Sequence, residues 1–298
     1  PRITHLSILS SKHFFSINLT RNHHLKSLQK NKFYEWLMKI SLLASGSKGN
    51  SIVVVGKKSA LMIDAGLSGK KIFERLEMVG VDKEIISAIL VTHEHSDHVR
   101  GAGIISRKLK IPLYINELTY SETKQRGNRL GKIDRLQFFE NGVSFEFGDF
   151  LIHPFSVPHD SINNSCFRIS EINSDEDLVI LTDLGFPTKL VKNKIKNPST
   201  IVLESNHDIG KLINGPYEWH LKQRIKGKNG HLSNDQAGEL MLEIFHPKLK
   251  NIILAHLSEE NNEPEIAFNS MKKLILENKI NCNLYVALQH TPTELIEV

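Results

Sequence analysis

The stretch Ile86-Ser-Ala-Ile-Leu-Val-Thr92 is followed directly by His93-Glu-His-Ser-Asp-His98. The first part is a continuous apolar run, which is typical of a strand that is buried on both faces. The second part gathers three imidazoles and the carboxylate of Asp97, the ligand types that suit divalent ions such as zinc or manganese. The alternative, a histidine-rich surface loop, would not need a buried strand before it. We therefore predict a strand that ends in a metal-binding turn, with the ligands His93, His95, Asp97 and His98.

Three more ligand-type residues follow later apolar strands, each at the carboxyl end of its strand. His159 follows the predicted strand 150–157, Asp183 follows 178–182, and His256 follows 250–255. One such residue alone is more often structural than a ligand. Because α/β folds usually carry their active sites at the carboxyl ends of buried strands, all three are expected to meet the histidine turn.

From residue 38 onward, short apolar strands alternate with amphipathic helical stretches. Early strands come in hairpin-like runs and later ones alternate with helices, which predicts layers of sheet and helix. Strands are predicted at 39–44, 51–56, 59–64, 86–92, 112–115, 143–147, 150–157, 164–170, 178–182, 199–204, 250–255 and 283–287. Helices are predicted at 69–79, 100–109, 117–126, 187–194, 217–225, 233–245 and 264–277. Without a repeat or linker after Met38, residues 38–298 are expected to form one domain.

The net charge of +5 resides in the first 37 residues of the chain. That segment holds six basic side chains and one acidic side chain, whereas residues 38–298 are balanced. Bulk charge therefore says nothing about partners. Because residues 1–37 lack a helical or strand period and precede Met38, we expect a disordered extension or a misassigned start.

Membrane and disulfide classes are disfavoured. No apolar run reaches the roughly 18 residues that a membrane span needs, so no membrane partner is expected. The two cysteines, Cys166 and Cys282, are too few for a disulfide framework and fit a reducing cytoplasm. Nothing in the sequence indicates an oligomeric state.

Together these motifs resemble the metallo-β-lactamase superfamily. The resemblance rests on the histidine turn, on the later ligand-type residues, and on Leu61-Met-Ile-Asp-Ala-Gly66, which is similar to the superfamily's first motif. Three more segments resemble the bacterial YycJ/WalJ-type family: Leu42-Leu-Ala-Ser-Gly-Ser-Lys-Gly-Asn-Ser51, Gly230-His-Leu-Ser-Asn234 and Leu254-Ala-His-Leu-Ser-Glu-Glu-Asn-Asn262. The resemblance covers nearly everything from Met38 to the C-terminus.

This resemblance implies a four-layer αββα sandwich with two divalent metal ions. It implies that the first metal is held by His93, His95 and His159, the second by Asp97, His98 and His256, and that Asp183 bridges them. Asp64 is expected to lie behind the histidine turn and to hold its backbone. His231 competes with His256 for the last ligand position, and we prefer His256 because it ends a buried strand.

Two residues are candidates for acid catalysis. His231 precedes Ser233-Asn-Asp-Gln236, a capping-box pattern, and a histidine there can face an anion bound at the helix N-terminus. Glu204 ends the strand 199–204 and could orient the His231 ring in its protonated form, which suits a general acid. The pair resembles the Glu and His that phosphodiesterases of the superfamily place beside the scissile phosphate. Unrelated surface residues are the alternative, and His207 could replace either partner.

The segment between the first two predicted strands is rich in small polar residues. Its backbone N–H groups and the side chains of Ser45, Ser47, Lys48 and Asn50 could bind a substrate phosphate. The segment matches no nucleotide-binding fingerprint, so a tight structural loop is an equal alternative.

Two metal ions that share a carboxylate suit in-line hydrolysis of a phosphodiester. The resemblance implies a DNA substrate in preference to RNA, and a 5′-to-3′ exodeoxyribonuclease in DNA maintenance. A small-molecule hydrolase acting on a lactone or thioester is the main alternative, and it would have no use for a Glu204–His231 pair. An RNA-processing nuclease also stays open, although only 73 positions separate Asp183 from His256. That interval has no room for the large inserted domain of many RNA-processing relatives.

Overall fold

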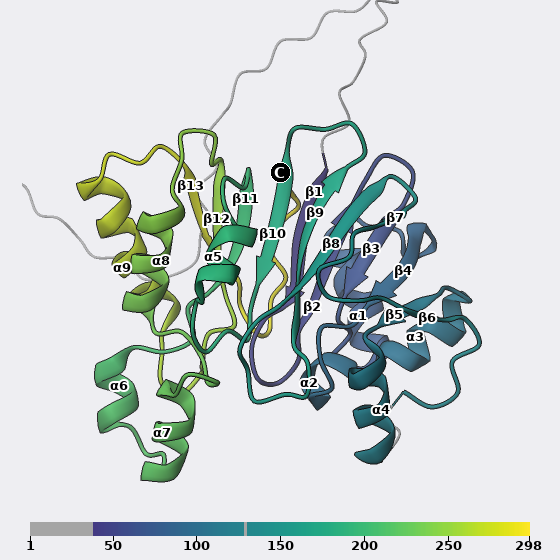
Figure 1. Cartoon of the computed structure of the whole chain (residues 1–298), viewed down its shortest axis with the longest axis horizontal. Coiled ribbons are helices and arrows are strands. Elements are labelled where there is room, and N and C mark those ends of the chain that lie inside the picture. Colours follow the sequence, from purple (N-terminus) through teal and green to yellow (C-terminus); the bar gives the residue numbers. More distant parts are fainter. Residues whose placement is uncertain (1–37, 128–129) are drawn as a thin grey trace, which may run out of the picture. The chain divides into compact units, whose positions relative to one another are not determined.

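Two mixed β-sheets lie face to face in the structure, a computed structural model that describes residues 38–127 and 130–298 (Figure 1). Seven described strands form the first sheet, in the spatial order β14 (Ile296–Glu297), β1 (Lys39–Ala44), β2 (Ser51–Val55), β3 (Ala60–Ile63), β4 (Ile86–Leu90), β5 (Leu113–Ile115) and β6 (Leu136–Phe138). Seven more form the second, in the order β13 (Asn283–Val286), β12 (Asn251–Ala255), β11 (Thr200–Glu204), β10 (Asp177–Leu181), β9 (Ser165–Glu171), β8 (Phe150–Ser156) and β7 (Phe145–Phe147).

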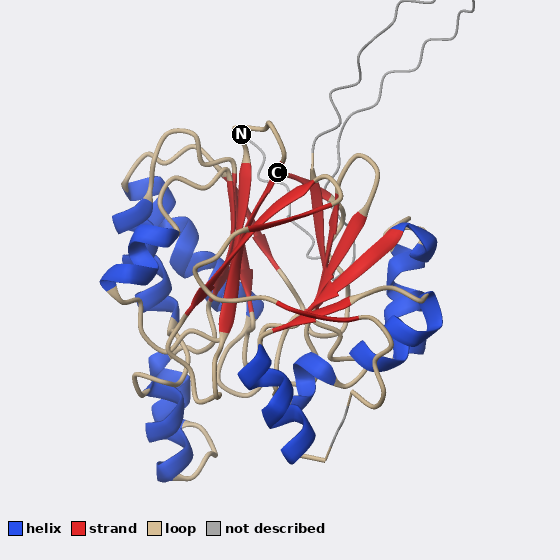
Figure 2. Ribbon diagram, turned by 45° about the vertical axis from the view of Figure 1, so that its right-hand side comes forward, coloured by secondary structure: helices blue, strands red, loops and turns tan. Residues whose placement is uncertain are grey.

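Helices cover the outer faces of the two sheets (Figure 2). They are α1 (Gly69–Met78), α2 (Ser96–Val99), α3 (Ala102–Leu109), α4 (Glu117–Gln125), α5 (Lys189–Lys194), α6 (Ile209–Asn214), α7 (Trp219–Lys226), α8 (Asn234–Ile244) and α9 (Pro264–Glu277), with a 3-10 turn η1 (Lys83–Ile85). The predicted four-layer αββα sandwich is confirmed. Within the two described ranges, no helix is long and apolar enough to cross a membrane.

Burial of both strand faces explains the continuous apolar runs in the sequence. In β3, Leu61 and Ile63 point into the core between the sheets, whereas Ala60 and Met62 pack against the layer that contains α1 and α3. Successive side chains of a strand point to opposite faces, so a strand with helices on one side and a sheet on the other needs apolar residues throughout.

Strand direction brings the site residues to one edge. Strands β3 to β6 run parallel in the first sheet, and β10 to β13 run parallel in the second. β8 shares the direction of β10, because β9 is antiparallel to both. The carboxyl ends of β3, β4, β8, β10, β11 and β12 therefore carry the residues that sequence analysis singled out.

The predicted helices and strands are present, and none of their ends is shifted by more than two residues. The pattern missed β6, β14, α2 and α6, which are too short to show a period. Described residues from 38 onward belong to one compact unit. The prediction for residues 1–37 concerns a segment outside the described residues.

Candidate metal centre

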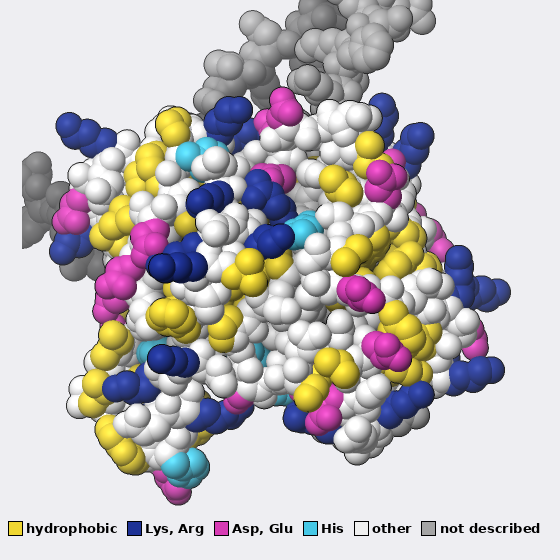
Figure 3. All heavy atoms as spheres, in the orientation of Figure 1, with side chains coloured by type: hydrophobic (Ala, Val, Ile, Leu, Met, Phe, Trp, Pro, Cys, Tyr) yellow, Lys and Arg dark blue, Asp and Glu magenta, His cyan; other side chains and the backbone are white. Residues whose placement is uncertain are grey.

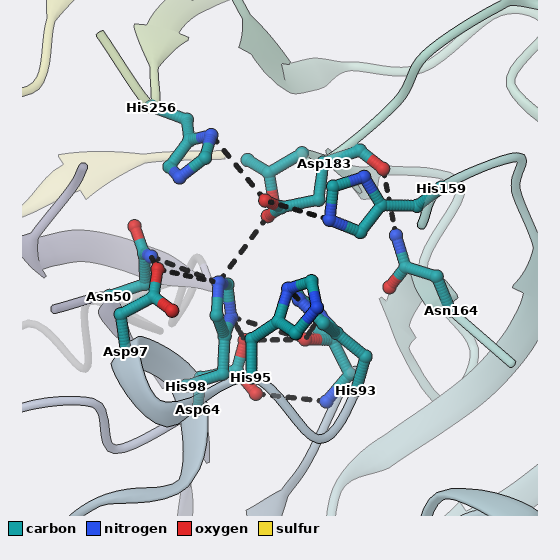
Figure 4. A network of polar contacts seen from close by, with 12 residues as sticks. Asn50, Asp64, His93, His95, Asp97, His98, His159, Asn164, Asp183 and His256 are labelled. Carbon is teal, nitrogen blue, oxygen red and sulfur yellow. Dashed lines mark hydrogen bonds and ion pairs between the residues drawn. The ribbon is translucent and has the colours of Figure 1, made fainter. Parts of the chain in front are cut away.

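The histidine turn follows β4 and leads into α2. Figure 4 shows its imidazoles facing Asp183 and His159, which come from the opposite sheet. His95 caps α2 in an extended conformation, so the chain changes direction between His95 and Asp97. Gly66 makes room for this turn, because a Cβ atom there would lie 1.5 Å from the carbonyl oxygen of Asp97.

The three imidazoles predicted for the first metal lie together. His93 Nε2 is 3.0 Å from His95 Nδ1, and the ring of His159 is centred 5.1 Å from that of His93. One nitrogen from each ring lies within 4.8 Å of the other two. His93 and His159 are buried, and His95 is partly exposed, which leaves one side of this group accessible.

The residues predicted for the second metal form a group of their own. Asp97, His98 and His256 each place one ligand-type atom within 4.8 Å of the others. His98 Nε2 is 3.4 Å from Asp97 Oδ2. His256 reaches this group from the end of β12, 158 positions further along the chain than His98.

Asp183 lies between the two groups. Its Oδ2 atom is 3.5 Å from His98 Nε2, and its Oδ1 atom is 3.8 Å from His159 Nε2. The carboxylate therefore offers one oxygen to each group, as a bridging ligand must.

These donors fit divalent metal ions. Two ligand atoms of a tetrahedral zinc ion, each about 2.1 Å from it, are roughly 3.4 Å apart. The separations of 3.4, 3.5 and 3.8 Å around Asp183 and His98 are close to that value. Asp183 Oδ2 and His256 Nε2 are buried and have no hydrogen-bond partner among the described residues. Because unpartnered buried polar atoms are costly, a cation at this place would satisfy both.

The buried carboxylates of the site raise the pKa values of two neighbouring histidines. Burial disfavours protonated His98, but Asp64, Asp183 and Asp97 together raise the pKa of this imidazole well above its usual value. Burial likewise opposes protonation of His256, yet Asp183 and Glu204 raise its pKa to about 9. Without cations the carboxylates thus hold protons on these rings, and bound metal ions would displace them.

Glu204, the last residue of β11, forms hydrogen bonds with two histidines of the site. The carboxylate is fully buried and accepts hydrogen bonds from the Nδ1 atoms of both His231 and His256, each at 2.8 Å. It also accepts backbone N–H groups of Asp183, Leu184 and Leu232 at 3.0 to 3.2 Å. Burial tends to raise the pKa of Glu204, but its two histidine partners hold it well below the usual value. Among the described residues, His207 forms no hydrogen bond with Glu204 or His231, and burial lowers the pKa of His207 to about 4.

Comparisons with known proteins agree with this geometry. A family model described as the metallo-beta-lactamase superfamily matches residues 44–187. The chain is 39% identical over 266 residues to exodeoxyribonuclease WalJ of Streptococcus pneumoniae, which covers 87% of this chain and 98% of WalJ. The chain belongs to the metallo-β-lactamase superfamily.

Within this superfamily the chain is a metal-dependent hydrolase of the WalJ/YycJ family. It is 37% identical over 239 residues to exodeoxyribonuclease YycJ of Bacillus anthracis, covering 80% of this chain and 89% of YycJ. The fold alone is shared with the metallo-β-lactamase fold protein YhfI from Bacillus subtilis, at a TM-score of 0.64 and 14% identity. That superposition covers 86% of this chain and 99% of YhfI.

Asp64 supports the histidine turn of this metallo-β-lactamase fold from behind. Its carboxylate accepts the Thr92 backbone N–H at 2.8 Å and contacts His98 Nδ1 at 2.7 Å. The second contact leaves His98 Nε2 facing Asp97 and Asp183. Partners of this kind orient a ligand ring without touching the metal.

Replacing Asp64 by Ala is expected to weaken metal binding about 10- to 100-fold, because His98 then loses its fixed orientation. Competition with a chromophoric chelator measures the affinity, and circular dichroism checks that the variant is folded. Exposed Asp134, replaced in the same way, serves as the control. Unchanged affinity in the Asp64 variant would contradict the supporting role.

The loop between β1 and β2 holds the four residues predicted to bind substrate, two of which are buried and two exposed. Ser45 is buried, and its hydroxyl accepts the His256 backbone N–H at 2.7 Å. Asn50 is also buried, and its amide nitrogen lies 3.1 Å from Asp97 Oδ2 and 3.0 Å from His98 Nε2. Both side chains therefore hold site residues in place. Ser47 and Lys48 are exposed, although Lys48 pairs with Glu259 at 2.6 Å.

Three site residues adopt a left-handed backbone conformation, which side chains other than glycine rarely do. The φ angles of Asp64, Asp183 and His256 are 57°, 55° and 56°. This backbone is stabilised at two of the three positions by asparagines that sequence analysis did not identify. Asn164 donates to the carbonyl of Asp183, and Asn206 donates to that of His256, both at 2.8 Å. Strain of this kind persists only where neighbouring groups hold it.

Glu94 was also missed, although it stands within the histidine turn. Its side chain is fully buried, and Oε1 accepts the Ile162 backbone N–H at 3.1 Å. Ile162 belongs to the loop that carries His159. Glu94 therefore ties the histidine turn of one sheet to the His159 loop of the other. A glutamate between two ligand-type histidines is a signal that sequence analysis could have used.

Replacing Glu94 by Ala should lower metal affinity about tenfold, because His159 is then less firmly placed against His93 and His95. Glu94→Gln, which keeps an acceptor oxygen for Ile162, should stay near wild type. Metal retention during dialysis against a graded chelator series gives the comparison. An equal loss of metal affinity in Glu94→Ala and Glu94→Gln would mean that the charge of Glu94, rather than its contact with Ile162, determines metal affinity.

Proposed function

We propose that this chain is a two-metal phosphodiester hydrolase that acts on DNA as a 5′-to-3′ exodeoxyribonuclease. The observation that carries the proposal is the contact of 2.8 Å between Glu204 Oε1 and His231 Nδ1 beside the metal-type clusters. A histidine–carboxylate pair next to such a centre suits protonation of an alkoxide leaving group. The similarity to WalJ and YycJ, which are named exodeoxyribonucleases, supports DNA as the substrate.

The proposed ligands are His93, His95 and His159 for one ion, Asp97, His98 and His256 for the other, and Asp183 for both. Zinc and manganese both suit this donor set. Two such ions, when bound, would supply an activated hydroxide near neutral pH and stabilise negative charge on the phosphoryl group. Asp97 stays ionised, since His98 and His256 outweigh its burial and lower its pKa.

His231 is the proposed general acid. The contact with Glu204 occupies Nδ1, so Nε2 is the atom that can give a proton to the leaving oxygen. The His231 ring is centred 5.1 Å from the rings of both His159 and His256, and its side chain is 18% exposed. It therefore stands next to both metal-type groups and remains open to a substrate. Ser233 and Gln236 form the predicted capping box, which fixes the start of α8 just after His231.

A small-molecule hydrolase remains the second candidate for the chemistry, and an RNA-processing nuclease is the second candidate for the substrate. A thioester releases a thiolate, which departs without help from an acid, so the buried contact between Glu204 and His231 favours the phosphodiesterase over a thioesterase. We also propose that the exposed residues Ser47 and Lys48 contact the substrate. The free thiols of Cys166 and Cys282 suit a cytoplasmic location, which is part of the same proposal.

The proposal is tested by incubating metal-loaded protein with a single-stranded DNA that carries a 5′-phosphate and a 3′-fluorophore. A matched strand with phosphorothioate linkages at its 5′ end, and an RNA of the same sequence, are run in parallel. Stepwise shortening from the 5′ end, blocked by the phosphorothioates and absent in Asp97→Ala, is the expected result. Hydrolysis of a lactone or thioester with no cleavage of either nucleic acid would overturn the proposal.

A further inference from the structure

Helices α6 and α7 form a separate excursion, residues 209–228, between Glu204 and His231; we call it the α6–α7 arm. Figures 1 and 2 show it extending beyond the ends of the strands of the second sheet. None of the residues of α7 is buried, and Trp219 is 65% exposed. A tryptophan is normally well buried, so this one is available to a partner.

The C-terminal end of α7 contacts the segments that carry His231 and His159. His231 donates its backbone N–H to the Ile225 carbonyl at 2.8 Å, and His159 Nδ1 lies 3.2 Å from the Gly230 carbonyl. Arg224 pairs with Asp160, the residue after His159. The arm therefore has a defined position next to the general acid and the first metal group.

The arm is basic. It holds five basic side chains and one acidic side chain, Glu218. Three of the five are engaged: Lys211 pairs with Glu263, Arg224 pairs with Asp160, and Lys222 donates to carbonyls at the end of α6. Lys226 and Lys228 are exposed and pair with no acidic group among the described residues. Figure 3 shows the surface hollowed between the arm and α4, with Lys and Arg side chains on both sides of the hollow.

We propose that the α6–α7 arm binds the single-stranded DNA that leads into the metal centre, with backbone phosphates on Lys226 and Lys228 and a base stacked on Trp219. This inference rests on the proposed function. Exposed aromatic rings next to free lysines are how proteins hold single strands without sequence preference. Trp219 lies about 10 Å along the helix from Lys226, at 1.5 Å per residue. A strand of several nucleotides can therefore contact both residues at once.

Two arm variants and one control test the inference. Lys226→Glu/Lys228→Glu should weaken single-strand binding about tenfold and flatten its salt dependence, since phosphate contacts carry that dependence. Trp219→Ala should weaken binding between about fivefold and a hundredfold, the range measured for base stacking. Lys57→Glu/Lys58→Glu makes the same charge change in the β2–β3 loop, at the opposite end of β3 from Asp64, and should behave as wild type.

Hydrolysis of a short ester, thymidine 5′-(p-nitrophenyl phosphate), should be unchanged in both arm variants. A second readout uses Trp36→Phe, because the chain has two tryptophans and Trp219 is then the sole fluorophore. Its emission should be quenched when oligothymidylate is added in the presence of a chelator, which prevents cleavage.

The outcomes separate the inference from the proposed function. If oligothymidylate quenches the Trp219 emission, and this quenching is lost in Lys226→Glu/Lys228→Glu, then strand binding by the α6–α7 arm is supported even if wild-type protein cleaves no DNA. If wild-type protein cleaves DNA and the arm variants bind and cleave it equally well, then the proposed function stands and strand binding by the α6–α7 arm is refuted. An equal fall in strand and ester hydrolysis also overturns it, because the arm would then act only on the structure of the centre.

Discussion

Asp183→Asn is expected to lower the bound metal from two ions per chain to one at most, and to reduce DNA cleavage about a thousandfold or more. The Asp183 carboxylate faces both metal-type groups, through contacts of 3.5 Å to His98 and 3.8 Å to His159. An amide carries no charge to hold two cations together. Loss of about 4 kcal/mol of transition-state stabilisation corresponds to this fall in rate.

Metal analysis of the purified variant, together with cleavage of the 3′-labelled strand, measures both effects of Asp183→Asn. Asp235→Asn, an exposed position in the first turn of α8, is the matched control and should keep two ions and full activity. The bridging role would be refuted by a variant that retains two ions and cleaves DNA at the wild-type rate.

His231→Ala is expected to lower kcat for DNA by a factor of about 100 to 10,000, the usual contribution of a general acid. Metal content should stay at two ions, because the proposed histidine ligand from this side of the second ion is His256, just past the end of β12. The defect should nearly vanish with the p-nitrophenyl ester, whose leaving group departs without a proton. This dependence on the leaving group separates an acid from a residue that only shapes the site.

His246→Ala, beyond the far end of α8, is the control for His231→Ala. If His231→Ala instead loses one ion, His231 is the last metal ligand and His256 is not. That outcome has a structural basis, because His231 and His256 share Glu204 Oε1 and lie with Asp183 in one group of metal-type residues. A rate that falls equally with both leaving groups would also refute acid catalysis.

The strands and the histidine turn were predictable because their causes are local. β4 is buried on both faces, so each of its positions needs an apolar or small side chain. The turn that follows packs its ligand-type residues within six positions. Asp183 and His256 could be singled out for a related reason, since each stands just past a buried strand.

Contacts between distant segments were not predictable in this way. For Ser45 and Asn50 the sequence left phosphate binding and a tight structural loop equally open. Their contacts with the His256 backbone and the Asp97 carboxylate appear only in the folded chain. Glu94 carried a local signal, its place between two ligand-type histidines, but its partner Ile162 lies 68 positions away and could not be identified from the sequence. Asn164 and Asn206 acquire their role only when the backbone of Asp183 and His256 is in place.

By itself, then, the sequence determined the buried strands and the ligand-type residues that follow them, because strand burial and the place of a residue after a strand depend on neighbouring positions. The four-layer αββα arrangement was implied by the family resemblance. The tertiary structure decided how those residues pair. One buried carboxylate, Glu204, meets His231 and His256, which are 27 and 52 positions away. No local pattern encodes that choice, because it depends on where β11, β12 and the start of α8 come together in space.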